Sequence, residues 1–269
     1  FGSSQSFQSF DAVASCIRER QNLIMAPMSS RSRSRSPPMG ETRKENSVRS
    51  MVGERSMVCN IKFVTVEGLA TSQAFKPSAG DVFISSYPKT GTTWLQQICH
   101  QLRTGGDIDF DEITEEGIVP WLEVGPSLSQ KIDCHQKAKP RVFKTHQSLS
   151  QLSHMEDLDV RYLCVVRDPV ATMVSFFKFE VGHDIPCARS RDINTFLSSG
   201  YIIERPDGEF KPLFGASLWD MYKEFWHCRN LPNVKLLVFE DLKEDLDSQL
   251  DDIANFIGAP APDVETRHK

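Results

Sequence analysis

The 269-residue sequence contains no long hydrophobic run, and none of its apolar stretches approaches the roughly 18–20 residues that a membrane-spanning helix requires. Paired cysteines are also absent, because the seven cysteines are scattered and none belongs to a C-x-x-C pair. Scattered cysteines are more typical of a reducing compartment than of a disulfide framework. We therefore expect a cytoplasmic protein without a membrane segment.

A metal-binding pattern is missing as well. Cysteine and histidine are neighbours at three places, 99–100, 134–135 and 227–228, but these positions do not show the ligand spacing of a zinc site. The sequence therefore gives no reason to expect a bound metal.

Charge is unevenly distributed along the chain. Residues 1–56 contain nine Lys or Arg against five Asp or Glu, a charge of +4, whereas the whole chain carries −5 and the remainder therefore −9. This first segment is rich in Ser and Arg, with SSRSRSRSPP at 29–38, and cannot bury enough apolar surface to offset the entropy of ordering it. We expect a disordered basic tail. The acidic remainder argues against nucleic-acid binding, except through the Arg-Ser repeats at 29–38, which can bind RNA or be phosphorylated.

From about Met57 onward, strand-like runs alternate with helix-like runs, a pattern that predicts βαβ units. We therefore expect one α/β domain over residues 57–269, with a central parallel sheet and helices on both faces. The expected strands are 82–86, 141–144, 161–166 and 234–239, and the expected helices are 92–103, a helix beginning at 169, 218–226 and 246–257. Two irregular stretches, about 104–140 and 181–215, are long enough to be lids or binding walls.

The stretch YPKTGTTW, residues 87–94, joins the first expected strand to the first expected helix. Such a loop directs backbone N–H groups and the positive end of the helix at one point, which favours an anion. Gly91 permits close backbone approach and Lys89 adds a cation. A nucleotide-kinase loop requires G-x-x-x-x-G-K-[ST], but here the lysine precedes the glycine and Thr92 occupies the place of the lysine. This P-loop-like strand–loop–helix is therefore not typical of an ATP- or GTP-hydrolysing enzyme.

Three motifs together resemble one family. YPKTGTTW resembles the 5′-phosphosulfate loop of the cytosolic sulfotransferases, whose sulfonate donor is 3′-phosphoadenosine-5′-phosphosulfate (PAPS). RVFKTH at 141–146 resembles their strand that ends in Lys-Thr-His, and VVRDPVATMVSFFKF at 165–179 resembles their 3′-phosphate element. The order and spacing fit the family over about residues 75–269. The resemblance implies the sulfotransferase fold and transfer of a sulfonate group from PAPS to a hydroxyl or amine of a small acceptor, without a metal.

The reacting centre then falls on Lys89, His146 and Lys144. Charge builds up on the leaving phosphate oxygen during sulfonyl transfer, so a cation fixed there, Lys89, stabilises the transition state. The acceptor's proton requires a base that works at neutral pH, and His146 matches the family's catalytic histidine. Lys144 lies two residues earlier on the same face of the strand, which would allow it to reach the sulfonyl oxygens.

The resemblance implies further residues for the donor. Contacts to the phosphosulfate are expected from Lys89, Thr90, Gly91, Thr92 and Thr93. Trp94 would offer a flat face to the adenine, and Arg167 and Ser175 would hold the 3′-phosphate, since arginine presents a bidentate fork. Asp168, where the family commonly has asparagine, is expected to turn away from the phosphate as a helix N-cap.

The acceptor pocket is expected to have aromatic walls. Trp121, within GIVPWLEVG, and Phe179, at the end of the 3′-phosphate element, are the residues that the resemblance assigns to them. Aromatic walls would suit phenols, sterols or other apolar alcohols.

One departure from the family concerns the end of the chain. Family members carry an Arg-Lys-Gly element near a Gly-Asp-Trp, and a dimer motif, beyond the position of Lys269. We therefore expect a domain that is incomplete at its C-terminus, and the oligomeric state is left open. Two alternatives to an active sulfotransferase follow. One is a P-loop phosphotransferase, and the other is a catalytically impaired relative that binds PAPS or PAP, the nucleotide left after transfer, with an Arg-Ser tail that engages RNA or a protein.

Overall fold

The computed structural model describes residues 64–152, 156–157, 159–182, 192–198 and 216–268. The expected basic tail at 1–56 lies outside the described residues, as does most of the irregular stretch 181–215. The strands are β1 (Val82–Ser86), β2 (Val142–Thr145), β3 (Arg161–Val166) and β4 (Val234–Val238). The α-helices are α3 (Val66–Ala74), α4 (Thr92–Thr104), α5 (Pro169–Gly182), α7 (Ile193–Ser198), α8 (Leu218–Cys228), α9 (Phe239–Glu244), α10 (Leu246–Ile257) and α11 (Val264–His268), and the 3-10 turns are η1 (Gly125–Leu128) and η2 (Leu149–Gln151).

The four strands form one parallel sheet in the order β2-β1-β3-β4. Val82 of β1 lies opposite Val142 of β2 and Arg161 of β3, so the three strands begin and end at nearly the same level. The chain leaves β1 toward one edge of the sheet and leaves β3 toward the other. In open α/β sheets a crevice forms beyond the carboxyl ends of the strands at such a switch point. The predicted parallel sheet is therefore confirmed, and its topology marks the β1/β3 end as the place for a ligand.

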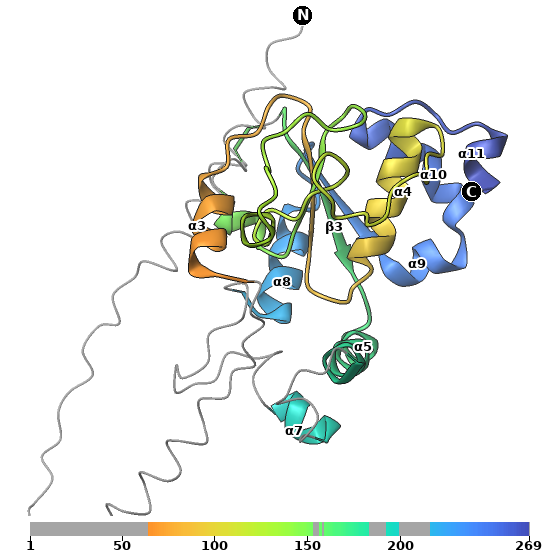
Figure 1. Cartoon of the computed structure of the whole chain (residues 1–269). Helices are drawn as coiled ribbons and strands as arrows, with labels where there is room; N and C mark the ends of the chain where they lie inside the picture. Colours follow the sequence, from red (N-terminus) through yellow and green to blue (C-terminus); the bar gives the residue numbers. More distant parts are fainter. Residues whose placement is uncertain (1–63, 153–155, 158, 183–191, 199–215, 269) are drawn as a thin grey trace, which may run out of the picture.

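Helices cover both faces of the sheet, as expected (Figure 1). Alternate strand residues point to opposite faces: Phe83, Phe143 and Tyr162 stack in one row, with Phe83 lying 5.3 Å from Phe143 and 5.6 Å from Tyr162 between ring centroids. This row packs into a core with α8, whereas Ile84 and Leu163 belong to a second core with α4 and α10. Figure 1 shows α3 and α8 on one side of the sheet, α4 and α10 on the other, and α5 and α7 beyond the carboxyl end of β3.

The element boundaries differ from the expected ones in a few places. The strand expected at 141–144 is shifted by one residue, and the one expected at 234–239 ends at Val238 because Phe239 begins α9. Gly258 ends α10 in the left-handed conformation at φ 77°, as expected. Four short helices, α3, α7, α9 and α11, were not predicted, and α7 lies in a stretch that was expected to be irregular. Each has nine residues or fewer, which is too short for a clear apolar periodicity.

Candidate functional site

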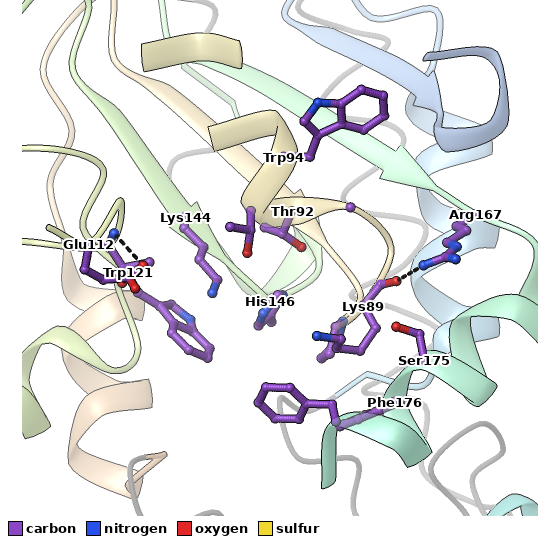
Figure 2. Close-up of a pocket in the computed structure, with 15 residues that line it drawn as sticks. Lys89, Thr92, Trp94, Glu112, Trp121, Lys144, His146, Arg167, Ser175 and Phe176 are labelled. Carbon is purple, nitrogen blue, oxygen red and sulfur yellow. Dashed lines mark hydrogen bonds between the residues drawn. The ribbon is translucent and has the colours of Figure 1, made fainter. Parts of the chain in front are cut away.

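A cavity of about 470 Å³ opens at the carboxyl ends of β1, β2 and β3. Its walls come from the loop after β1, the first turn of α4, the end of β2, the residue after β3, α5, and the irregular stretch before β2. The residues that line it are Pro88, Lys89, Gly91, Thr92, Thr93, Trp94, Glu112, Thr114, Trp121, Lys144, His146, Arg167, Ser175, Phe176 and Phe179. Figure 2 shows Lys89, Lys144 and His146 around a common space, with Trp121 and Phe176 at its sides. The sheet thus brings together residues that lie up to 91 positions apart in the sequence.

The loop after β1 is held in its conformation by glycine and by hydroxyl groups. Gly91 is the N-cap of α4 at φ 107°, a conformation that side chains rarely adopt, and it provides no side-chain cap for the helix's first N–H groups. A Cβ at Gly91 would lie 2.5 Å from Cδ2 of Phe239. Thr92 is anchored by a 2.6 Å hydrogen bond between its Oγ1 and Oγ of Ser86. The positive end of α4 is therefore directed into the cavity.

Nearly all of the predicted site residues line this one cavity, and Thr90 is the exception. Its side chain is buried, and its hydroxyl donates a 2.7 Å hydrogen bond to the carbonyl of Tyr87. Thr90 therefore stabilises the turn from within, and its side chain does not reach the cavity that its neighbours line.

The imidazole of His146 is buried and held in one tautomer. Nδ1 lies 2.7 Å from the carbonyl oxygen of Ser86, and since a carbonyl only accepts, Nδ1 must carry the proton. Burial, the charge of Lys144 and, more weakly, that of Lys89 lower the pKa of His146 well below its usual range of about 6.5. The ring is therefore neutral near pH 7, with the lone pair on Nε2, which is the form that can accept a proton. Trp121 packs against it edge-on, with 5.0 Å between ring centroids.

Two lysines each lie over an aromatic ring of the cavity wall. Nζ of Lys144 is 3.5 Å from the ring centroid of Trp121, and Nζ of Lys89 is 4.2 Å from that of Phe179. Burial lowers the pKa of Lys144 to about 8, although attraction to the carboxylates of Glu123 and Glu112 opposes the change. The pKa of Lys89 is lowered by burial and then by the charge of Arg167.

Arg167 lies at the start of the segment after β3 and closes the loop side of the cavity. Its Nη1 donates a 3.0 Å hydrogen bond to the carbonyl of Lys89 (Figure 2). Its guanidinium carbon is 4.5 Å from the ring centroid of Phe239. Nε of Arg167 is buried without a hydrogen-bond partner in the described part of the chain. Trp94 contacts the same Phe239 ring at 5.6 Å between centroids. A half-buried cation whose buried Nε–H is unpaired, beside a second cation, is the environment that an anionic group would complete.

Asp168 turns away from this cation, as expected. Its Oδ1 accepts a 2.7 Å hydrogen bond from the backbone N–H of Ala171 and so caps the first turn of α5. Ser175, on the same helix, lines the cavity on the side of Lys89.

Two carboxylates were not predicted, one that lines the cavity and one buried behind His146. Glu123 is fully buried, and its Oε1 accepts a 2.6 Å hydrogen bond from the backbone N–H of His146 and a 2.9 Å bond from Oγ1 of Thr145. Glu112 lines the cavity, and its Oε1 accepts hydrogen bonds from the hydroxyl and backbone N–H of Thr114, at 3.2 and 3.4 Å. The one signal for Glu123 was a charged residue inside the otherwise apolar GIVPWLEVG. Glu112 is one of several acids between 107 and 116, and nothing distinguished it from the others.

The charges of the site divide it into two halves. Lys89, Arg167 and the N-terminus of α4 form a positive half, and the aromatic rings of Trp121, Phe176 and Phe179 form an apolar half. The neutral imidazole of His146 lies between them. Over the described ranges, no three His, Cys, Asp or Glu side chains group closely enough to hold a metal ion, and no helix has the length and apolarity to cross a bilayer. The arrangement can bind a phosphorylated anion beside an apolar molecule and accept a proton from the latter.

Comparison with known proteins identifies relatives of this chain. A family model described as "Sulfotransferase domain" matches residues 79–268. Sulfotransferase 1A1 of Mus musculus is 28% identical over 213 residues, which cover 73% of this chain and 66% of the relative. Sulfotransferase 1C2 of Homo sapiens is 27% identical over 205 residues, which cover 72% of this chain and 64% of the relative. The chain therefore spans somewhat less than two thirds of the length of these curated relatives.

Two solved structures are similar to it in three dimensions. Mouse sulfotransferase SULT7A1 complexed with PAP has a TM-score of 0.57 at 22% identity, covering 77% of this chain and 69% of that one. Retinol dehydratase in a complex with retinol and PAP has a TM-score of 0.58 at 19% identity, covering 76% of this chain and 67% of that one. At these identities the likeness establishes the fold, and it agrees with the α/β fold expected from the sequence.

Proposed function

Since the chain belongs to the sulfotransferase domain family, we propose that it is a PAPS-dependent sulfotransferase that transfers a sulfonate group to a hydroxyl or amine of a small acceptor. The observation that carries the proposal is the neutral, buried imidazole of His146, whose Nδ1–H is donated to Ser86 and which lies between a cationic half and an aromatic half of one cavity. A base in that position can accept a proton during transfer only if the cationic half holds a sulfonate donor and the aromatic half holds an acceptor with a labile proton.

The cationic half suits PAPS. Lys89, Gly91, Thr92 and Thr93 surround the N-terminus of α4, which would hold the phosphosulfate, while Arg167 and Ser175 would hold the 3′-phosphate. The unpaired buried Nε of Arg167 supports an anion on that side. Trp94, the last lining residue of this half, would contact the adenine. PAPS supplies the sulfonate group and a phosphate leaving group. Both solved relatives are complexes with PAP, which supports the same nucleotide for this chain.

The chain's own residues then act on protons and charge. His146 accepts the proton of the acceptor hydroxyl or amine at Nε2, and Ser86 holds the ring in the tautomer that permits this. Lys89 stabilises the charge that develops on the leaving phosphate oxygen, together with the N-terminus of α4. Lys144, which remains largely protonated at pH 7 with a pKa of about 8, would face the sulfonyl oxygens. No metal is required for these roles.

The apolar half suits a flat, largely apolar acceptor. Trp121 and Phe179 would form walls of this half, Phe176 adds a third ring, and Glu112 places a carboxylate beside Trp121 (Figure 2). Retinol is bound by one of the solved relatives and supports an apolar alcohol as one class to test. We also propose a cytoplasmic location, supported by the free thiols of the four cysteines in the described part of the chain.

The proposal is tested by transfer of radiolabelled sulfonate from PAPS to a panel of phenols, sterols, aliphatic alcohols and amines. His146→Ala should reduce kcat by about 10²–10⁴-fold, the usual contribution of a general base, and leave the PAP Kd from calorimetry unchanged. Lys89→Ala should reduce kcat by at least about 10²-fold and weaken PAP binding as well. The matched control is His227→Ala, an exposed histidine whose Nδ1 also contacts a backbone carbonyl, that of Lys223 at 2.6 Å.

Three outcomes would count against the proposal. Full activity of His146→Ala would remove the assigned base. PAP binding without any transfer would favour the catalytically impaired relative, and Mg²⁺-dependent nucleotide hydrolysis without transfer would favour a phosphotransferase.

A further inference from the structure

The segment that ends in Glu123 runs alongside the end of β2 and places the carboxylate of Glu123 against the backbone of His146. Backbone hydrogen bonds of 3.0 Å join the N–H of Lys144 to the carbonyl of Pro120 and the N–H of Leu122 to the carbonyl of Lys144. These bonds fix the register between the two segments, so that Glu123 faces Thr145 and His146. Its side chain is fully buried, although a buried carboxylate is costly unless it is hydrogen-bonded or paired with a cation.

We propose that Glu123 is a positioning residue for the sulfonate transfer proposed above: one of its oxygens holds the strand end that carries His146, and its negative charge balances that of Lys144. This role rests on the proposed function, because it assigns a purpose to Glu123 only through the base and the cation that act in that reaction.

The geometric part of the role lies in two hydrogen bonds to one oxygen. Oε1 of Glu123 accepts the backbone N–H of His146 at 2.6 Å and the hydroxyl of Thr145 at 2.9 Å. Oγ1 of Thr145 in turn accepts the N–H of Gln147 at 3.0 Å, so the backbone of 145–147 is tied to a single carboxylate. The ring of His146 is tied separately, by its 2.7 Å bond to Ser86. The bonds to Glu123 therefore set the position of His146, and that position allows the ring to make the bond to Ser86 that fixes its tautomer.

The electrostatic part concerns Lys144. The charged groups that act on it are the carboxylates of Glu123 and Glu112, which favour its protonated form, and the ammonium of Lys89, which disfavours it. His146, which also faces Lys144, is neutral near pH 7 because burial and the charge of Lys144 lower its pKa. Burial alone would drive the lysine toward its neutral form, and the attraction of Glu123 is the largest opposing effect. Burial likewise raises the pKa of Glu123 to about 7, while the N–H of His146, the hydroxyl of Thr145 and the charge of Lys144 favour its ionised form.

The two parts can be separated by two substitutions. Glu123→Gln retains an oxygen that accepts the bonds from His146 and Thr145 but removes the charge, whereas Glu123→Ala removes both. The matched control is Glu224→Gln, because Glu224 is also buried and its Oε1 also accepts a backbone N–H, that of Ser150 at 3.0 Å, on the α8 side of the sheet.

For Glu123→Gln we expect kcat at pH 6.5 to stay within about threefold of the wild-type value, while the alkaline limb of the kcat profile, near pH 8 in the wild type, moves down by about one pH unit. For Glu123→Ala we expect kcat to fall by about 10²-fold, as misplaced catalytic groups commonly cause. In both variants the PAP Kd should stay within about threefold of wild type, since Glu123 does not line the cavity. Glu224→Gln should move neither the limb nor kcat.

A second measurement does not depend on turnover. The ¹⁵N spectrum of histidine-labelled protein, with the His146 signals assigned from His146→Ala, should show the neutral Nδ1–H tautomer in the wild type and in Glu123→Gln, and a mixture of tautomers in Glu123→Ala. If the wild type transfers no sulfonate, the proposed function fails, but this spectrum still decides whether Glu123 positions His146. The positioning role is wrong if the alkaline limb of the kcat profile lies at the same pH in Glu123→Gln as in the control Glu224→Gln. It is also wrong if His146 keeps the wild-type tautomer in Glu123→Ala. If Glu123→Ala does not fold, the pH of the alkaline limb in Glu123→Gln is the measurement that tests the role.

Discussion

Replacing Gly91 by alanine should damage both the fold and the donor half of the site. Gly91 is the N-cap of α4 at φ 107°, where any residue with a Cβ is strained. The added Cβ would also lie 2.5 Å from Cδ2 and 3.0 Å from Cε2 of Phe239. These atoms belong to a rigid ring, so they cannot move apart from the rest of the ring. The Phe239 ring must therefore move, and it is the ring on which Arg167 and Trp94 rest.

The magnitude follows from two separable costs. A left-handed conformation costs a non-glycine residue about 1–2 kcal/mol, and overpacking a filled site costs about 1–3 kcal/mol. Gly91→Ala should therefore lower the free energy of unfolding by about 2–5 kcal/mol. Gly105, at the other end of the same helix, provides the matched control. It also has a positive φ, of 71°, but a Cβ there would meet nothing within 4 Å. Gly105→Ala should thus show the conformational cost alone, about 1–2 kcal/mol.

Urea unfolding of both variants measures the two costs, and calorimetry with PAP measures the effect on the site. We expect Gly91→Ala to lose at least about 1 kcal/mol more than Gly105→Ala and to bind PAP about tenfold more weakly, because Arg167 and Trp94 lose their support. In a Phe239→Ala background the excess over Gly105→Ala should disappear. Equal losses for the two glycines in the native background would refute the steric part of the reasoning.

Two further predictions concern the cations. Lys144→Met should abolish transfer yet raise the free energy of unfolding at pH 7 by about 1–2 kcal/mol, because burial holds the pKa of Lys144 down at about 8 and a methionine needs no charge to be buried. Between about pH 8 and the ordinary lysine pKa of 10.5, the unfolded chain binds a proton at Lys144 that the folded chain has released. The free energy of unfolding of the wild type should therefore rise with pH through this window. Urea titrations of Lys144→Met should lack this rise. Arg167→Lys should weaken PAP binding by about tenfold or more, because lysine offers neither the planar fork nor the stacking on Phe239. A calorimetric Kd within twofold of wild type would show that Arg167 does not contact the nucleotide.

Much of the fold could be predicted because its central strands are buried on both faces. Val82–Ser86 and Arg161–Val166 are continuous apolar or small-residue runs, and the structure gives both strands the predicted bounds. The helix α10 was equally clear, since its apolar residues recur at helical spacing and Gly258 ends it. The helix α3 was not predictable, because VEGLATSQA has no continuous apolar stripe.

Candidate site residues could be predicted where they belong to a sequence motif, but not where their role depends on a tertiary contact. Lys89, His146 and Arg167 follow the carboxyl ends of three strands, and parallel pairing brings those ends together. Glu112 and Glu123 were missed because their roles depend on Thr114, Thr145 and His146, which the folded chain places beside them. Thr90 was also expected to contact the donor; its hydroxyl bonds to Tyr87 within the turn, and the assignment stays a prediction.

The sequence by itself determined the order of strands and helices and the chemical types at the strand ends, because both follow from local hydrophobic patterns and short motifs. Only the tertiary structure decided which groups are charged and which are free to react. The neutral state of His146, the lowered pKa of Lys144 and the raised pKa of Glu123 all arise mainly from burial. Burial is a property of what the folded chain places around a residue, and no stretch of sequence contains it.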